Sequence, residues 1–516
     1  MALPLRRRHG ADLTMDLERF RLRRFLESLP PAELQRVEEP IALGDVAAVH
    51  DGNAKAVWFR RAGGAELAAN VTASRSRLAL AFDTTPDRLL AEVLRRLDTP
   101  QPVADVTSAP AQEAVEADPD LTALPVHLQH GYDGAPYISA SMDFTRDPAR
   151  DATNVGIRRL MLRGRREAGV DLNAPSDLQA IYRAAVARKE RLPIAFVVGS
   201  HPVDHVAAAM RLPGDELSLM ASLRGAPLPV VKCKTNDLRV PADAEYVLEG
   251  YLDERGYVEP EGPYGEFLGY YGALKTNPVF HLTAVTHRKD AIFQTATISG
   301  RRLDRTDTAQ LNAIRVEVSV WRALAAAVGE VVAVYATPSS GGAFNLRASV
   351  RQRLPGEARI AIGAVFATPV NVKHVFIVDP DVDVFSDEQM DWALATRFQA
   401  DRDLVVASGF RAMPLDPSLR GAKTGAKAGF DLTLPFGERT GVESRPPEPP
   451  RYDGRWFESL EAALADGPKF FVELMSARGS RDGREIVREL ERLRGSGHLE
   501  RDAEGRYVYR PAAAAR

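Results

Sequence analysis

Apolar residues recur at helical spacing in several long stretches of the chain. The spacing predicts helices over residues 16–37, 86–97, 176–188, 310–328 and 386–397. Shorter apolar runs bounded by Gly and Pro predict strands over 194–198, 230–233, 279–286, 291–297, 331–335 and 375–378. Helices and strands interspersed in this way indicate an α/β protein built from several domains.

Changes in composition divide the chain. A stretch rich in Ala, Pro, Asp and Glu over 104–119 predicts a linker. The strand-rich part from 123 to 300 predicts a sheet or barrel with inserted helices, and an α/β unit is expected from 305 onward. A second linker, rich in Pro, Arg and Glu, is expected over 437–455.

The residues from 456 to the C-terminus form a separate pattern. Helices are expected over 458–465, 470–476 and 482–493, followed by a hairpin within 499–509. Three helices followed by a hairpin is the element order of a winged helix. Arginines of the third helix alternate with glutamates, as on a solvent-facing helix. We therefore expect an oligomer contact or a lid rather than a nucleic-acid-binding module.

Charge and cysteine content narrow the class of protein. The formal net charge is -3, from 67 Lys+Arg and 70 Asp+Glu, which does not indicate a nucleic-acid-binding field over the whole chain. The single cysteine, Cys233, excludes an intramolecular disulfide and a Cys-rich metal site, and it fits a reducing compartment. No apolar run reaches the roughly 18 residues of a membrane span. We expect a cytoplasmic protein with no membrane partner.

Two carboxylates flank a tight turn in Glu261-Gly262-Pro263-Tyr264-Gly265-Glu266. Gly and Pro bend the chain sharply, so both side chains can point into one cleft. Two carboxylates in a site of low dielectric do not both ionise easily, and one then holds a proton that it can donate. The alternative is a solvated turn with two exposed glutamates.

Three further segments carry candidate chemistry. In Asn154-Val155-Gly156-Ile157-Arg158-Arg159 a glycine permits close approach of a ligand, the Asn offers an oxygen to a hard cation, and the second Arg offers a fork for an anion. Glu216 follows a turn and either binds a metal ion or sits as an acid at a helix start. His201 and His205 have the i, i+4 spacing of a metal pair, but Pro202 favours a loop-to-helix junction with ordinary histidines.

Taken in order, segments over residues 16–440 resemble the UbiD family of decarboxylases. The matching residues are Asn154-Val155-Gly156-Ile157, Glu216, Val230-Val231-Lys232-Cys233-Lys234-Thr235-Asn236-Asp237-Leu238, Glu261-Gly262-Pro263-Tyr264-Gly265-Glu266, Val375-Phe376-Ile377-Val378-Asp379, Trp392-Ala393-Leu394-Ala395-Thr396-Arg397 and Ala426-Lys427-Ala428-Gly429-Phe430-Asp431.

The resemblance implies an architecture of three parts, to which the tail is added. We expect a disordered tail over 1–14, an N-terminal α/β part over 15–122 and a flavin-binding split β-barrel over 123–304. An α/β oligomerisation domain over 305–440, a linker over 441–455 and a winged-helix-like module over 456–516 follow. Members of the family form dimers or larger homo-oligomers.

The resemblance also implies a cofactor and a reaction. The family uses prenylated FMN, made by a separate flavin prenyltransferase, with a divalent metal, Mn²⁺ or Mg²⁺, and K⁺. The implied activity is that of a carboxy-lyase: non-oxidative, reversible or irreversible decarboxylation of an aromatic, heteroaromatic or α,β-unsaturated acid through a covalent adduct with the cofactor. Tyr264, Tyr270 and Tyr271 make the core closer to the hydroxybenzoate branch than to the cinnamate branch.

The family's Glu-Arg-Glu network falls on Glu261, Arg159 and Glu266, and Glu266 matches the proton donor. Asn154 and Glu216 match metal ligands. The remaining cofactor-binding positions match Ile157, Arg158, Arg159 and Lys427.

One position departs from the family pattern. Many members carry a histidine as the third metal ligand, where this chain has Asp177. An aspartate can bind a hard cation through oxygen, or it can merely cap the helix expected over 176–188. The departure motivates one rival hypothesis, a cofactor-free subunit of a carboxylase complex. A second rival hypothesis, a DNA-binding regulator, rests on the tail module alone.

Overall fold

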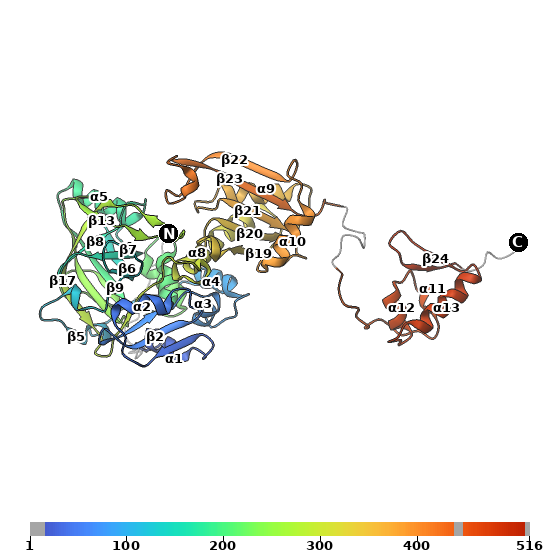
Figure 1. Ribbon diagram of the computed structural model, residues 1–516, viewed down its shortest axis with the longest axis horizontal. Helices are drawn as coiled ribbons and strands as arrows, with labels where there is room; N and C mark the ends of the chain where they lie inside the picture. Colours follow the sequence, from blue (N-terminus) through green and yellow to red (C-terminus); the bar gives the residue numbers. More distant parts are fainter. Residues whose placement is uncertain (1–15, 438–446, 511–516) are drawn as a thin grey trace, which may run out of the picture. The chain divides into compact units, whose positions relative to one another are not determined.

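The computed structural model describes residues 16–437 and 447–510, which fall into two units (Figure 1). One unit ends at Thr433 and the other begins at Leu434. The expected tail over 1–14 lies outside the described residues, as does part of the expected linker; its described residues, 447–455, form no helix or strand. Within the described part of the chain, no helix is long and apolar enough to cross a membrane.

Six strands of the first unit close into a barrel. Their order is β12-β9-β6-β7-β8-β17, and pairing of β12 with β17 closes the ring. The strands are β6 (Tyr137–Asp147), β7 (Ala152–Leu162), β8 (Glu167–Val170), β9 (Leu192–Val198), β12 (Tyr246–Leu252) and β17 (Val279–His287). Closure leaves no unpaired edge between these strands, and the expected barrel is confirmed.

The N-terminal part forms a mixed four-stranded sheet, β1-β2-β3-β18. Its elements are α1 (Leu22–Ser28), β1 (Leu34–Val37), α2 (Leu43–His50), β2 (Ala56–Ala62), β3 (Ala65–Ala69), α3 (Arg75–Ala81) and α4 (Leu89–Leu97). The strand expected over 291–297 is β18 (Ile292–Gln294), and it pairs in parallel with β3 rather than with the barrel. The last stretch before the C-terminal domain therefore ties the barrel to the N-terminal sheet.

Two predictions for the N-terminal part are wrong. The single helix expected over 16–37 is a short helix followed by a strand, because Pro30 and Pro31 end the helix. The linker expected over 104–119 is paired structure. Its strands β4 (Val103–Asp105) and β5 (Ala114–Val115) pair with β10 (Leu228–Lys232) and β17.

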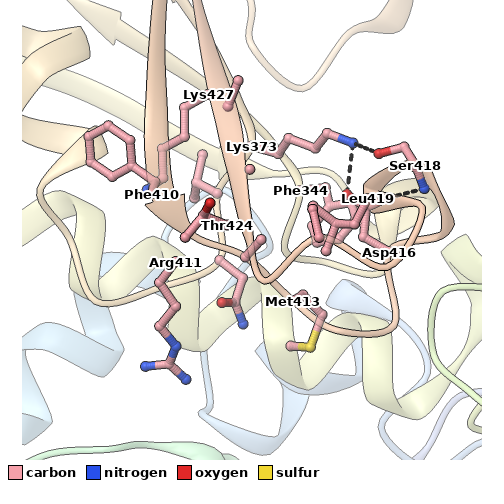
Figure 2. Close-up of a pocket in the computed structure, with 16 residues that line it drawn as sticks. Phe344, Lys373, Phe410, Arg411, Met413, Asp416, Ser418, Leu419, Thr424 and Lys427 are labelled. Atoms are coloured by element: carbon pink, nitrogen blue, oxygen red, sulfur yellow. Dashed lines mark hydrogen bonds and ion pairs between the residues drawn. The ribbon is translucent and has the colours of Figure 1, made fainter.

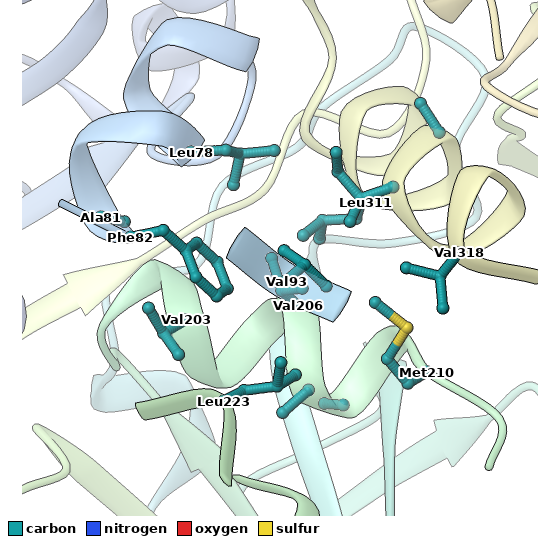
Figure 3. Packing of buried hydrophobic residues seen from close by; sticks show 14 of the residues in the cluster. Leu78, Ala81, Phe82, Val93, Val203, Val206, Met210, Leu223, Leu311 and Val318 are labelled. Carbon is teal, nitrogen blue, oxygen red and sulfur yellow. The ribbon is translucent and has the colours of Figure 1, made fainter. Parts of the chain in front are cut away.

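Three helices are inserted between barrel strands: α5 (Asp177–Ala187), α6 (Pro202–Ala209) and α7 (Glu216–Arg224). Helices α6 and α7 pack against α3 and α4, whereas α5 packs against β7. Strand β11 (Arg239–Pro241) pairs with β10. Figure 3 shows where α3, α4, α6, α7 and the long helix α8 (Asp307–Ala327) meet. Phe82, Val206, Leu223 and Leu311 are buried in this single cluster, which joins the barrel region to the domain that follows.

The C-terminal domain of the first unit is a five-stranded sheet, β19-β20-β21-β23-β22, with β20, β21 and β23 parallel. Its strands are β19 (Val331–Ala336), β20 (Asn345–Val350), β21 (His374–Val378), β22 (Leu404–Arg411) and β23 (Thr424–Leu432). Helices α9 (Glu357–Phe366) and α10 (Asp387–Arg397) accompany them. The α/β character expected after residue 305 is confirmed.

The second unit has its own small core. Helices α11 (Leu460–Ala465), α12 (Phe471–Ala477) and α13 (Arg484–Gly495) are followed by the hairpin of β24 (Leu499–Arg501) and β25 (Tyr507–Tyr509). Leu460, Leu474, Ile486, Leu490 and Leu493 are buried together. The helices and hairpin occur in the order expected from the sequence.

Candidate active site

Arg159 on β7 lies among three carboxylates, with 13% of its side chain exposed. Its Nε donates to Glu261 Oε1 at 3.1 Å, and its Nη1 donates to Glu266 Oε1 at 2.9 Å. Its Nη2 lies 3.0 Å from Oδ2 of Asp171, which follows β8. The guanidinium also lies over the ring of Tyr264, 4.5 Å from the centroid. One cation is therefore shared by three acids in a largely buried site.

The two glutamates come from the tight turn identified in the sequence. Glu261 ends β13 (Glu259–Glu261), which pairs with β16 (Lys275–Asn277). Glu266 follows β14 (Tyr264–Gly265), which pairs with β15 (Tyr271–Gly272). Both side chains are buried, so the alternative of a solvated turn is wrong. Gly272 leaves the space for Glu266, since a Cβ there would lie 2.6 Å from Glu266 Oε1.

The surroundings of Glu266 and Asp171 shift the pKa values of these two acids in opposite directions. Burial raises the pKa of Glu266 above its ordinary value, and the charge of Asp171 adds to the rise, while Arg159 opposes it. Burial also acts on Asp171, but Arg159, Lys275 and hydrogen bonds from Asn173 outweigh it and lower its pKa. Glu266 is therefore the group in this site suited to hold a proton near neutral pH and to donate it.

Two polar residues of this network were missed in the sequence. Asp171 contacts Arg159, and the buried Asn277 donates from Nδ2 to Glu261 Oε2 at 3.1 Å and to Asp171 Oδ1 at 3.4 Å. Neither belongs to a motif. The only feature in the sequence that could have indicated them is their position, because each is a polar residue at the end of a short strand or just beyond one. The sequence alone does not say which strands are neighbours, so it does not show that these two residues meet.

Asp133 supports the turn from outside the network. Its carboxylate accepts from the backbone N–H of Gly265 at 3.0 Å and from that of His130 at 2.9 Å. The imidazole of His130 packs against Gly265, where a Cβ would lie 2.5 Å from Nδ1. The backbone just before Glu266 is thus held on both sides.

A second cluster of oxygen donors surrounds Asn154. Asn154 Nδ2 lies 3.4 Å from Oδ2 of Asp143, the buried β6 residue opposite Gly156 in the barrel. Glu216, the first residue of α7, accepts a hydrogen bond from the backbone N–H of Val155. Asp143 Oδ1 is buried without a hydrogen-bond partner, and burial together with the charge of Asp143 raises the pKa of Glu216 to about 8. Two neighbouring acids, of which Asp143 is buried, form with an amide a donor set that fits a hard divalent cation.

Asp177 lies at the edge of this cluster. Its side chain is 58% exposed and pairs with Arg150 at 3.1 Å. The N-cap of α5 is Ser176, whose hydroxyl accepts from the backbone N–H of Gln179, so Asp177 is not the cap. The charge of Asp177 still reaches Glu216, because it helps to raise the pKa of that carboxyl.

An excess of arginine adjoins the donor cluster. Arg158 lies 3.5 Å from Asp143 and donates to the hydroxyl of Ser176. Burial and the neighbouring charges of Arg158 and Arg411 lower the pKa of Arg211. Such a concentration of positive charge suits a phosphate group. Ile157, between Val155 and the two arginines on β7, packs against the large core.

Lys427 on β23 lies beside a cavity of about 320 Å³ (Figure 2). The lysine is buried, its Nζ donates to the carbonyl of Phe366, and burial lowers its pKa. Lys373 and Arg411 also line the cavity, and Asp416, which pairs with Lys373 at 2.8 Å, is the carboxylate among the lining residues. The balance of charge favours an anionic ligand.

The histidine pair lies at a loop-to-helix junction, as predicted. His201 is the N-cap of α6 and packs edge-on against Phe20 and Phe25, while His205 is buried on the helix. Over the residues that the structure describes, no three His, Cys, Asp or Glu side chains are grouped to hold a metal ion.

Comparison with known families accounts for most of the first unit. The N-terminal, Rift-related and C-terminal domains of 3-octaprenyl-4-hydroxybenzoate carboxy-lyase, the UbiD domains, match residues 31–97, 103–302 and 309–432. The chain belongs to the UbiD family. It is thus a member of a family of decarboxylases, the carboxy-lyases expected from the sequence.

Named UbiD relatives cover the chain broadly. Anhydromevalonate phosphate decarboxylase of Methanosarcina mazei is 31% identical over 80% of this chain and 95% of its own length. The UbiD-class enzyme HmfF from Pelotomaculum thermopropionicum, solved with FMN, is 32% identical with a TM-score of 0.78 over 83% of this chain and 97% of its own. An evolved dimeric form of HmfF was solved with prFMN. Vanillic acid decarboxylase of Sedimentibacter hydroxybenzoicus, in an open form, is 30% identical with a TM-score of 0.76 over 86% and 98% of the two chains.

Proposed function

We propose that this UbiD protein decarboxylates an aromatic, heteroaromatic or α,β-unsaturated acid without net oxidation, with prenylated FMN as cofactor. The observation that carries the proposal is Arg159 bound to the buried Glu261 and Glu266, with Glu266 suited to hold a proton. A decarboxylation leaves negative charge on carbon, and a proton must replace the carbon dioxide. A buried acid with a raised pKa can supply that proton at neutral pH.

Glu266, Arg159 and Glu261 have different roles in the proposed reaction. Glu266 donates the proton to the carbon that has lost its carboxylate, and Arg159 keeps Glu266 oriented by the bond at 2.9 Å. Arg159 also keeps Glu261 oriented through the bond at 3.1 Å. When bound, prenylated FMN supplies the electron sink for the charge that carbon dioxide leaves behind. Glu266 is only 6% exposed, so solvent has little access to the proton that it carries.

The donor cluster and the arginines suit the cofactor's phosphate. Asn154 and Glu216 would hold Mn²⁺ or Mg²⁺, with Asp177 as a third oxygen donor after a change of its side-chain rotamer away from Arg150. Arg158 and Lys427 would contact the phosphate, Ile157 and Arg159 would line the flavin, and K⁺ would share the oxygen donors. The partners we propose are a flavin prenyltransferase, which would supply the cofactor, and further copies of this chain.

The metal assignment is tested on cofactor retention. We expect Asn154→Ala and Glu216→Gln to lower the flavin retained on purification about tenfold or more, the scale of a weakened metal site. Asp177→Asn should lower retention less, because its side chain is mostly exposed. Unchanged retention in the first two variants, with the fold intact, would reject this set of ligands.

The function is tested with protein co-expressed with a flavin prenyltransferase and supplied with Mn²⁺. Bound cofactor is identified by absorption and by its mass. Release of carbon dioxide is then followed over a panel of acids that includes dihydroxybenzoate, vanillate, furan acids and anhydromevalonate phosphate. We expect release from at least one acid, and a loss of at least about 100-fold in Glu266→Gln. A cofactor-loaded protein that releases nothing from any of them would contradict the proposal.

Two outcomes would favour the rival hypotheses. A folded protein that stays free of flavin under these conditions would indicate a cofactor-free subunit of a carboxylase complex. Retarded migration of DNA by the isolated residues 451–516 at low salt would support the regulator.

A further inference from the structure

The third carboxylate on Arg159 has no place in the Glu-Arg-Glu scheme. Every nitrogen of the guanidinium faces a different acid: Nε faces Glu261, Nη1 faces Glu266, and Nη2 faces Asp171 at 3.0 Å. Asp171 is thus as close to the cation as either glutamate. An acid that shares a buried cation weakens the hold of that cation on the others.

We propose that Asp171 is a positioning residue that competes for Arg159 and thereby keeps the transferable proton on Glu266. The inference rests on the proposed decarboxylation and adds a residue to its machinery. Asp171 acts through Arg159, not on substrate.

Hydrogen bonds hold the carboxylate of Asp171 in place. Its Oδ1 accepts from the backbone N–H of Asn173 at 3.3 Å and from Nδ2 of Asn277 at 3.4 Å. The same Asn277 amide donates to Glu261, so one side chain fixes two of the three acids. Asn277 is itself held, because its Oδ1 accepts from the backbone N–H of Leu172 at 3.1 Å. The carboxylate of Asp171 therefore has little freedom to leave Arg159.

Counting charge shows why the third acid matters. Glu261, Glu266 and Asp171 face Arg159, and the next cation is Lys275 on β16, whose Nζ lies 4.0 Å from Asp171. Three carboxylates against two cations leave one negative charge in excess, and a proton on one acid removes it. Lys275 and the hydrogen bonds from Asn173 and Asn277 stabilise the ionised form of Asp171. Glu266 has fewer such partners, so the proton goes to Glu266.

The other titratable groups near Glu266 do not supply that proton. Burial raises the pKa of the phenols of Tyr137 and Tyr264, which stay neutral. Asp133 accepts hydrogen bonds from two backbone N–H groups and the ring of His130, on the far side of Gly265. The proton balance of the site thus lies with Arg159, Lys275 and the three acids.

The test is an infrared titration of cofactor-free protein, which needs no turnover. A buried protonated carboxyl gives a C=O stretching band, assigned to Glu266 by its loss in Glu266→Gln. In Asp171→Asn, that band should disappear at a pH lower by about one unit or more than in the unsubstituted chain, because the repulsion is gone and Arg159 is freed. Lys275→Met should shift it the opposite way. Asp253→Asn, which loses an ion pair to Arg255 elsewhere, should not shift it.

The pH profile gives a second readout in active enzyme. The alkaline limb of kcat should move to lower pH in Asp171→Asn and to higher pH in Lys275→Met, and Asp171→Glu should restore most of the original profile. Band and limb positions that stay unchanged in both variants would overturn the inference, even if both variants lose stability or activity uniformly over pH. Shifted bands in a protein that decarboxylates no acid would uphold the inference and reject the proposed function.

Discussion

At the scale of the residue, Arg159 compensates the charge of the buried carboxylates in the site. Glu261 and Glu266 are buried, and burial of a charge is costly unless a partner compensates it. Arg159 is that partner, and its own pKa is raised because the carboxylates outweigh the effect of its burial. The arginine is therefore needed for stability as well as for chemistry.

We expect Arg159→Met to lower the free energy of unfolding by about 3–5 kcal/mol at pH 8, the cost of leaving buried charges without a partner. The loss should shrink at acidic pH, because the carboxyls then take up protons. Urea unfolding at both pH values measures this. Arg165→Met, which breaks ion pairs with Asp118 and Asp120 at the surface, is the control and should change the free energy of unfolding little. Equal losses at both pH values would contradict the charge argument.

The raised pKa of Glu266 has a defined sign in stability. In the folded state Glu266 binds its proton more tightly than in the unfolded chain, whose pKa is near the ordinary 4.5. The stability that the neutral form contributes is present below 4.5 and is lost as the pH rises through the folded-state pKa. Glu266→Gln should therefore flatten the fall of unfolding free energy with pH above 4.5. If the slope of unfolding free energy against pH stayed unchanged in Glu266→Gln, the proton would be bound by a group other than Glu266.

At the scale of the element, the short hairpin β14–β15 places the acid. Its strands are only two residues each, so its geometry depends on glycines that let other groups approach closely. Gly265 admits His130 and Gly272 admits Glu266. Propensity alone would not predict so short a hairpin; the surrounding contacts hold it.

Gly272→Ala should displace the acid. The new Cβ would lie 2.6 Å from Glu266 Oε1, so the carboxylate must leave its place beside Arg159. We expect decarboxylation to fall about tenfold or more, since a shift of about 1 Å in a reacting group can cost 100-fold, while the thermal midpoint changes little. Gly363→Ala on α9, where nothing lies within 4 Å, is the matched control and should keep full activity. Full activity in Gly272→Ala would show that the observed position of Glu266 is not required.

At the scale of the whole molecule, the two units have hydrophobic clusters of their own. The helices of Figure 3 belong to a core that runs from the N-terminal part into the C-terminal domain of the first unit. The second unit packs around Leu460, Leu474, Ile486, Leu490 and Leu493 alone. Among the described residues no hydrophobic cluster spans both units, which favours two unfolding transitions.

We expect Leu490→Ala to destabilise only the second unit, by about 2–5 kcal/mol, because it leaves a cavity in a small core. Calorimetry should show the smaller transition move to lower temperature while the larger one stays in place. Val487→Ala on the same helix, where the side chain is exposed, is the control and should move neither transition by much. A shift of both transitions would show that the units fold together.

Local signals in the sequence were enough for much of the fold. Periodicity located α8, α10 and the three helices of the second unit to within a few residues, because amphipathic helices carry their pattern locally. It failed over 16–37, where Pro30 and Pro31 interrupt the apolar pattern, and over 104–119, where short strands find partners far along the chain.

By itself the sequence determined the turn with two carboxylates, the Asn154–Arg159 segment and the family, because those motifs are contiguous. Only the tertiary structure decided that Asp171 and Asn277 join Arg159, that Asp143 joins Asn154, and that Asp177 points outward. Within the barrel, β8 pairs with β17, where Gly169 lies opposite Val279, 110 residues further along the chain. Arg159 likewise finds Glu261 across a separation of 102 residues. A side chain's partner across such a distance is set by strand register, which no local pattern encodes.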